Sequence, residues 1–293
     1  MALKLRRREQ ADRGVRRLLL SQVQRIAKCV TAAPLTARHV HKARQYLKRL
    51  RALLRLLRRQ VPDSLTTRGH DWCRTLAHSL AARRDATVLT QTLQRLRKKR
   101  RAKLIDFDAW QSRLTEEAGE EETERSASFE ALNGLQAWAE ELARWPLAEG
   151  WDLFAPGLAR TYRAGRNAMI LARSSGGDED YHNWRKRVKD RWYQLALLRG
   201  MGQPKLGKYL AGLRRLAKQL GREHDLTMLI EKLAPLATAE QPSPESLVRL
   251  AERARRSLRR RALRTGRRLY AVTPRRDLKR LHRFWRAWRR GRD

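Results

Sequence analysis

Apolar residues recur every three or four positions along most of the chain, which is the spacing of amphipathic α-helices. In the segment 41–61 they gather on one face of a helical wheel: Ala43, Leu47, Leu50, Leu54, Leu57 and Val61. Similar periodicity predicts helices over 5–31, 83–96, 107–145, 157–173, 181–199, 207–220, 225–237, 245–272 and 275–290. Because Leu, Ala and Arg dominate and β-branched residues are sparse, the sequence predicts an all-α protein.

Capping and breaking residues indicate where the first helices begin and end. Pro34 ends the first helix, Thr36 can cap the second, and the second stops around Pro62. We expect a third helix, through Leu80, to be capped by Ser64 or Thr67.

The helix at 41–59 also carries a cationic stripe beside its apolar face. At 100° per residue, five basic side chains fall within about an 80° arc: His41, Arg44, Lys48, Arg51 and Arg55. They extend along about 21 Å of helix axis. Such a stripe is either a binding surface or a solvated face.

The stripe has a copy in the second half of the chain. The motif His-x-x-Arg-x-x-x-Lys begins at His41 and again at His182, an offset of 141 residues. The segments LAARRDATVL at 80–89 and LGREHDLTML at 220–229 align at an offset of 140. Two motifs in the same order favour a binding surface over a solvated face.

This duplication predicts the domain organisation. Pro146 and the segment 150–156 separate the halves, which we expect to be a first helical bundle over 1–150 and a second over 151–293. The bundles would face each other about a pseudo-twofold axis, and each would contribute a cationic stripe to a shared cleft.

The charge indicates the kind of partner. Lys and Arg number 68 against 30 Asp and Glu, which gives a net charge of +38 and a pI near 11.6. Such an excess predicts a polyanion: nucleic acid, an anionic membrane surface or a phosphate polymer. No apolar run is long enough for a transmembrane segment, and the N-terminus lacks a secretory signal core. Two cysteines, Cys29 and Cys73, indicate no disulfide framework and fit a reducing cytoplasm.

Several motifs in order resemble the CHAD family, the conserved histidine α-helical domains. They are His41-Lys-Ala-Arg44 with Lys48-Arg-Leu-Arg51, then Arg84-Asp85, and His182-Asn-Trp-Arg185-Lys186-Arg-Val-Lys189. The stretches TYRAGRNAMILAR at 161–173 and RRALRTGRRLY at 260–270 are also similar to that family.

This resemblance implies a pair of four-helix bundles with a basic central groove or pore that binds inorganic polyphosphate. It implies no catalysis, no cofactor and a cytoplasmic location on polyphosphate granules. Relatives fused to a triphosphate-processing tunnel domain carry an E-x-E-x-K motif, which is absent here, so the chain resembles a stand-alone module.

We expect the basic residues of the repeat and of the family-like stretches to bind polyphosphate. Arg can bridge two phosphate oxygens and Lys supplies a point charge, so binding should weaken steeply with salt. The candidates are His41, Arg44, Lys48, Arg51, Arg55, Arg160, Arg163, Arg166, His182, Arg185, Lys186, Lys189, Arg214, Lys218 and Arg264.

Two acidic and two histidine residues have secondary roles in this prediction. Asp85 and Asp225 would orient basic side chains or cap helices. Bound phosphate would favour the imidazolium form of His41 and His182, so we expect affinity to rise as the pH falls from about 8 to 6.

The two stripes differ at their ends. Arg51 and Arg55 correspond to Trp192 and Ala196, while Arg191 occupies a position where Leu is usual. The second stripe therefore has less positive charge at this end, or Arg191 supplies that charge from a neighbouring position.

RNA or DNA binding through the same surface is the alternative function. Nine Trp and six Tyr among many Arg offer stacking platforms, but Trp72, Trp138, Trp145 and Trp184 lie mostly on apolar faces. No P-loop, H-E-x-x-H, Cys-x-x-Cys or repeated carboxylate pair points to an enzyme or a metal site. The oligomeric state stays open.

Overall fold

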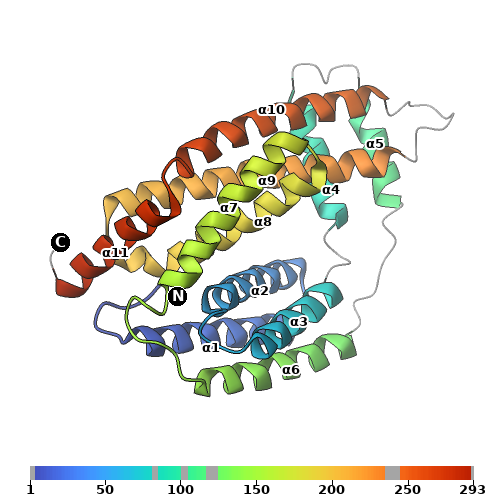
Figure 1. Cartoon of the computed structure of the whole chain (residues 1–293). Helices are drawn as coiled ribbons and strands as arrows, with labels where there is room; N and C mark the ends of the chain where they lie inside the picture. Colours follow the sequence, from blue (N-terminus) through green and yellow to red (C-terminus); the bar gives the residue numbers. More distant parts are fainter. Residues whose placement is uncertain (1–3, 81–84, 100–104, 117–124, 235–244, 292–293) are drawn as a thin grey trace.

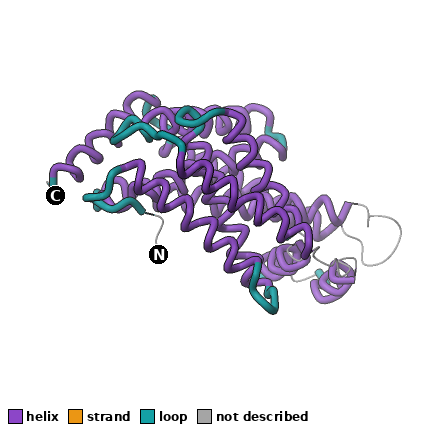
Figure 2. Tube along the Cα trace, turned by 90° about the horizontal axis from the view of Figure 1, so that it is seen from below, coloured by secondary structure: helices purple, strands orange, loops and turns teal. Residues whose placement is uncertain are grey.

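The computed structural model describes residues 4–80, 85–99, 105–116, 125–234 and 245–291 (Figure 1). These ranges contain eleven α-helices. The trace in Figure 2 shows helices and loops but no strand in the described residues. The helices are α1 (Ala11–Val30), α2 (Ala37–Leu57), α3 (Asp63–Ser79), α4 (Asp85–Arg97), α5 (Phe107–Glu116), α6 (Arg125–Arg144), α7 (Ala155–Ser175), α8 (Asp178–Leu197), α9 (Pro204–Leu233), α10 (Glu245–Leu269) and α11 (Pro274–Arg290). The all-α prediction is confirmed.

Helix α2 lies between two hydrophobic cores. Leu47, Leu50 and Leu54 face a core formed with α1, α3 and α6. Leu53 and Leu56 face a second core, formed mainly by α7, α8, α9, α10 and α11. With two flanks buried, α2 has only a narrow strip of surface left for its basic side chains.

Helices α7 and α8 approach α2 closely along the second core. A Cβ atom added at Gly157 of α7 would lie 2.2 Å from the carbonyl oxygen of Leu56, so this crossing requires glycine. On α8, the buried Gln194 donates from Nε2 to the carbonyl oxygen of Ala52 at 3.0 Å and accepts from Thr161 Oγ1 at 2.6 Å. These contacts fix the position of α8 against α2.

A third hydrophobic core lies between the helical hairpin α4–α5 and the helices α9 and α10. Helices α4 and α5 pack their apolar side chains on the C-terminal part of α9 and the start of α10, and Trp110, Leu229 and Leu247 lie at its centre. In Figure 1 the α4–α5 hairpin lies beside the C-terminal end of α9 and the N-terminal end of α10, away from α1, α3 and α6. Helices α4 and α5 thus pack against the second half of the sequence.

The two predicted helix caps in the first half have different outcomes. Thr36 does cap α2, accepting a hydrogen bond from the His39 amide at 3.4 Å. The prediction for α3 is wrong, because that helix begins directly after Pro62 and encloses Ser64 and Thr67.

In the second half, one long helix, α9, replaces the two expected over 207–220 and 225–237. Gly221 costs about 1 kcal/mol of helix propensity, which packing against α8 and α10 offsets. Of the helix expected over 107–145, α5 and α6 are described, and 117–124 lies outside the described residues.

Arg191 does not add its charge to the cationic stripe. Its side chain is fully buried, where it pairs with Asp277 of α11 and donates from Nη1 to the carbonyl oxygen of Leu158 at 2.9 Å. The guanidinium also lies 5.4 Å from the centre of the Tyr162 ring. The position where Leu is usual therefore holds a structural ion pair that joins α8 to α11.

We expect Asp277→Asn to lower the free energy of unfolding by about 3–5 kcal/mol, because it leaves the buried Arg191 without its counter-charge. Equilibrium urea unfolding followed by circular dichroism measures the loss. The double variant Arg191→Met/Asp277→Leu removes both charges and should recover most of the stability. A single variant within about 1 kcal/mol of the wild type would contradict this role for the pair.

Candidate functional site

Four arginines from three helices meet where α2, α7 and α8 cross. We call Arg51 and Arg55 of α2, Arg160 of α7 and Arg187 of α8 the junction cluster. Arg55 Nη1 donates to Asp190 Oδ1 at 2.9 Å, and Arg187 Nη1 lies 3.7 Å from the other oxygen of that carboxylate. Arg160 donates to the carbonyl oxygen of Arg55.

Positive charge exceeds negative charge in the junction cluster. Asp190 is the carboxylate that pairs with it among the described residues. Burial lowers the pKa of Arg55, and the charges of Arg51 and Arg187 lower it further against the pull of Asp190. Burial and then repulsion from Arg58 and Arg59 lower the pKa of Arg160. These shifts mark a place where an added anion would be electrostatically favourable.

The cluster remains open to solvent despite this burial. The Arg187 and Arg55 side chains are 41% and 26% exposed, whereas that of Asp190 is only 8% exposed. The guanidinium groups of the cluster can therefore meet a ligand from outside, while the carboxylate stays behind them.

At the N-terminal end of α2, Arg44 supports the fold as well as the stripe. Its Nη1 donates to the carbonyl oxygens of Ala77 at 2.9 Å and Leu80 at 3.2 Å, at the C-terminus of α3. A cation there also stabilises the negative end of the helix dipole. Its repeat partner Arg185 approaches the corresponding point of α9, with Nε 3.8 Å from where a Cβ of Gly221 would lie.

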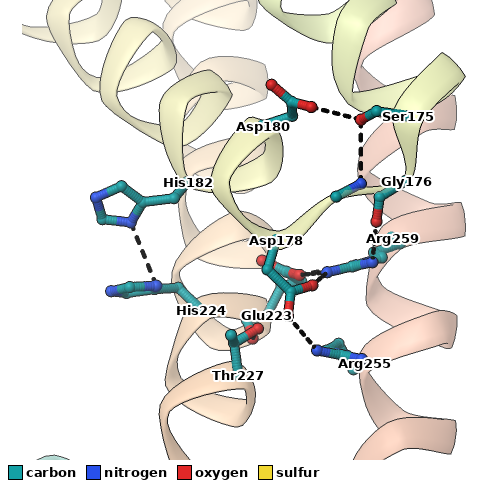
Figure 3. A network of polar contacts seen from close by, with 11 residues as sticks. Ser175, Gly176, Asp178, Asp180, His182, Glu223, His224, Thr227, Arg255 and Arg259 are labelled. Carbon is teal, nitrogen blue, oxygen red and sulfur yellow. Dashed lines mark hydrogen bonds and ion pairs between the residues drawn. The ribbon is translucent and has the colours of Figure 1, made fainter. Parts of the chain in front are cut away.

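The two predicted histidines lie in different environments. His41 is exposed and its Nε2 is 2.7 Å from Gln45 Nε2. His182 is half-buried against His224 of α9, with the two Nδ1 atoms 3.3 Å apart (Figure 3). Burial, followed by the charges of Lys186 and Arg185, lowers the pKa of His182. The fold therefore favours the neutral form of His182 in the free protein.

A polar network beside this pair holds the start of α8 in place (Figure 3). Arg259 of α10 donates to Glu223 Oε1 at 2.8 Å and to the Gly176 carbonyl oxygen at 2.6 Å, and it also pairs with Asp178. Arg255 reaches the second oxygen of Asp178 at 2.8 Å. The network is structural, because each of these cations is matched by a carboxylate.

Other predicted residues lie outside the junction cluster. Lys48 and Lys189 are half-buried, as is Arg166, whereas the remaining basic candidates are exposed: Arg163, Lys186, Arg214, Lys218 and Arg264. Asp225 pairs with Arg95 of α4 at 3.2 Å, which fits its predicted role of orienting a basic side chain. The side chain of Asp85 lies outside the described residues.

Two residues of the site were missed from the sequence. Arg187 follows Lys186 directly, and its repeat equivalent is Tyr46, so neither the motif nor the repeat singles it out. His70 of α3 lies near Arg51 and Arg55 and is half-buried, and its Nδ1 has no hydrogen-bond partner among the described residues. The His70 pKa is lowered to about 4 by burial and then by those arginines.

The described residues contain no cluster of three or more His, Cys, Asp or Glu side chains that could hold a metal ion. Within the described ranges, no helix is long and apolar enough to cross a membrane. Stacking platforms for bases are few, since eight of the nine Trp side chains are buried or half-buried and Trp145 is 37% exposed.

Comparison with known proteins finds a matching family model and similar solved structures. A family model described as the CHAD domain matches residues 17–234. The fold is similar to the crystal structure of the CHAD domain from the plant Ricinus communis, with a TM-score of 0.59 and 19% sequence identity over 88% of this chain and 90% of that chain. None of the curated proteins matches.

The depressed His70 pKa predicts a pH-dependent stability. The unfolded chain binds a proton near pH 6.5 and the folded chain only near pH 4, so stability falls as the pH drops through this range. Allowing for solvent screening, we expect the loss to be about 1–3 kcal/mol.

Urea unfolding of the wild type and His70→Gln at pH 7, 6, 5 and 4 measures this contribution. The variant should lose less stability than the wild type between pH 7 and 4, because its amide does not titrate. Parallel stability curves for the two proteins would show that His70 is not held neutral.

Proposed function

The chain belongs to the CHAD domain family, and we propose that its junction cluster binds inorganic polyphosphate without catalysing a reaction. The observation that carries the proposal is the surplus of guanidinium groups around Asp190, with the lowered pKa values of Arg55 and Arg160. Each phosphate drawn into the cluster would relieve repulsion among cations that the fold already holds together.

The chemistry of the cluster suits a repeating phosphate chain. Polyphosphate has about one charge per internal phosphate and no bases to read, so its recognition needs donors at several points and no particular sequence. The fixed guanidinium groups of three helices provide such donors. Arg is favoured over Lys for this task because its planar fork bridges two oxygens of a phosphate.

We further propose that the bound chain continues from the junction cluster along α8. Lys189, Lys186, Arg185 and His182 lie on that helix, and His182 and Asp190 are separated by about 12 Å of axis. Helices α1, α2, α3 and α6 from residues 1–150 and helices α7 to α10 from residues 151–293 would then form two pseudo-symmetric four-helix bundles on either side of a basic groove, with α4 and α5 packed on the second bundle. The outlying candidates Arg163, Arg166, Arg214, Lys218 and Arg264 would contribute to the field around it.

The lowered His182 pKa changes the expected pH response of binding. The imidazolium form is disfavoured in the free protein, so a phosphate near His182 must supply the energy of protonation. The affinity gain from His182 therefore continues to a lower pH than for an unperturbed histidine, because it is complete only below the lowered pKa of the free protein.

Binding of RNA or DNA through the same cations is the alternative. The described surface offers little base stacking, because Trp138 and Trp184 are buried and Trp145 is 37% exposed. A surface that reads phosphates alone would favour the polymer with the highest charge density. In a cell, binding of polyphosphate would bring the protein to polyphosphate granules.

We expect long-chain polyphosphate to displace labelled single-stranded RNA from the wild type at about 150 mM salt, and RNA to displace polyphosphate poorly. The variant Arg51→Gln/Arg160→Gln/Arg187→Gln should bind polyphosphate at least about tenfold more weakly. It retains the Arg55–Asp190 pair, so that carboxylate keeps its nearest counter-charge.

The matched control is Lys28→Gln/Lys205→Gln/Arg286→Gln, which removes three exposed cations outside the cluster. Equal affinity losses in the two triple variants would show that polyphosphate binding depends on net charge and not on the junction cluster. Preferential binding of RNA by the wild type would favour the nucleic-acid alternative.

A further inference from the structure

A second cationic site lies where the α4–α5 hairpin meets α9 and α10, away from the junction cluster. A half-open cleft of about 260 Å³ runs between the end of α4, the middle of α9 and the middle of α10. Its rim carries five basic side chains: Arg95, Lys98, Lys99, Arg222 and Arg261. In Figure 1, α4 lies beside α9 at this end of the molecule, with α10 running past them.

Most of the charge at this rim has no carboxylate partner among the described residues. Arg95 pairs with Asp225 at 3.2 Å and also donates to Gln91 Oε1. Within the described part of the chain, no carboxylate lies within ion-pair distance of Lys98, Lys99, Arg222 or Arg261. An anionic group at the rim would therefore meet four cations that no described carboxylate compensates.

The floor of the cleft is apolar and distinguishes it from a plain anion site. Leu96, Leu226, Ala254 and Leu258 line the cleft, and the hydroxyl-bearing residues Thr92 and Ser257 lie among them. Inorganic phosphate would gain nothing from leucine side chains and would lose hydration against them. A planar group with apolar faces and polar edges would bury the faces on this floor and leave its edges to the hydroxyl-bearing residues.

The size of the cleft limits how much of a ligand it can hold. Its volume is just below the range of about 300–1,000 Å³ typical of sites that enclose a drug-sized ligand. A planar base with its sugar would occupy the floor, and an attached chain of phosphates would extend to the basic rim.

The cleft has no counterpart in the other half of the repeat. At the observed offset of 140, Arg222 corresponds to Ala82, and Lys98 and Lys99 correspond to Thr238 and Ala239. Duplication of the cationic stripe therefore does not explain this rim, and each chain would carry one such site.

We propose that this cleft binds a nucleoside triphosphate, with the base on the apolar floor and the phosphates on Arg222, Arg261 and the lysines of α4. The site is separate from the junction cluster, and its occupancy does not depend on polyphosphate binding.

Photolabelling with 8-azido-ATP followed by peptide mapping tests the placement directly. We expect the label on the segments around Leu226 or Leu258, and we expect ATP to suppress it at a concentration at least about tenfold lower than tripolyphosphate requires. Labelling confined to other segments, or equal suppression by tripolyphosphate, would overturn the proposal, because the floor would then have no role.

Two variants test the rim and the floor separately by calorimetric titration with ATP. Arg222→Ala/Arg261→Ala removes exposed rim charges and should weaken ATP binding at least about tenfold. Ser257→Trp fills the cleft and should abolish labelling at these segments, while polyphosphate affinity stays within about twofold of the wild type.

Arg267→Ala/Arg268→Ala is the matched control, because both side chains are exposed on the same helix and neither lines the cleft. It should leave ATP affinity within about twofold of the wild type. Unchanged ATP affinity in the rim variant, or a loss as large in the control, would contradict the site, and circular dichroism verifies folding in each case.

Discussion

The burial of α2 on two flanks is the constraint on which the proposed site depends. Leu50 and Leu54 belong to one core while Leu53 and Leu56 belong to another, so the helix cannot rotate without exposing apolar surface to water. This fixed rotation of α2 determines which strip of the helix stays at the surface, and Arg51 and Arg55 lie on that strip. The Gln194–Ala52 hydrogen bond and the close approach of Gly157 then bring α8 and α7, with their arginines, to the same strip.

Holding Arg51, Arg55 and Arg187 around the Asp190 carboxylate has an electrostatic cost in the unliganded protein. Removing either partner of the half-buried Arg55–Asp190 pair would leave an uncompensated charge, so the pair acts as an anchor for the other cations. The Arg191–Asp277 pair is fully buried and belongs to the fold, and Asp277 also accepts a hydrogen bond from Arg280 at 2.7 Å. In a chain with 68 Lys and Arg residues, solvent exposure separates candidate binding cations such as Arg187, whose side chain is 41% exposed, from structural cations such as the fully buried Arg191.

Local patterns were sufficient to predict the helical class, the Thr36 cap and the cationic stripe of α2, because each depends on neighbours within one or two turns. The continuity of α9 through Gly221 was missed, since it depends on packing against α8 and α10. Whether Arg187 or Lys186 joins the junction cluster depends on the rotation of α8 against α2. The burial of Arg191 depends on Asp277, a residue 86 positions away that no periodicity connects to it.

The salt dependence of polyphosphate affinity tests the central claim most directly, because its slope counts the cations that displace counterions from the polymer. By analogy with nucleic acids, each phosphate contact contributes about −0.7 to −0.9 to the slope of log K against log salt. We expect replacement of Arg51, Arg160 and Arg187 by Gln to make the slope shallower by about 2 to 3, with a smaller change on replacing Lys28, Lys205 and Arg286. An unchanged slope in the cluster variant would contradict the claim that these arginines contact the phosphate chain.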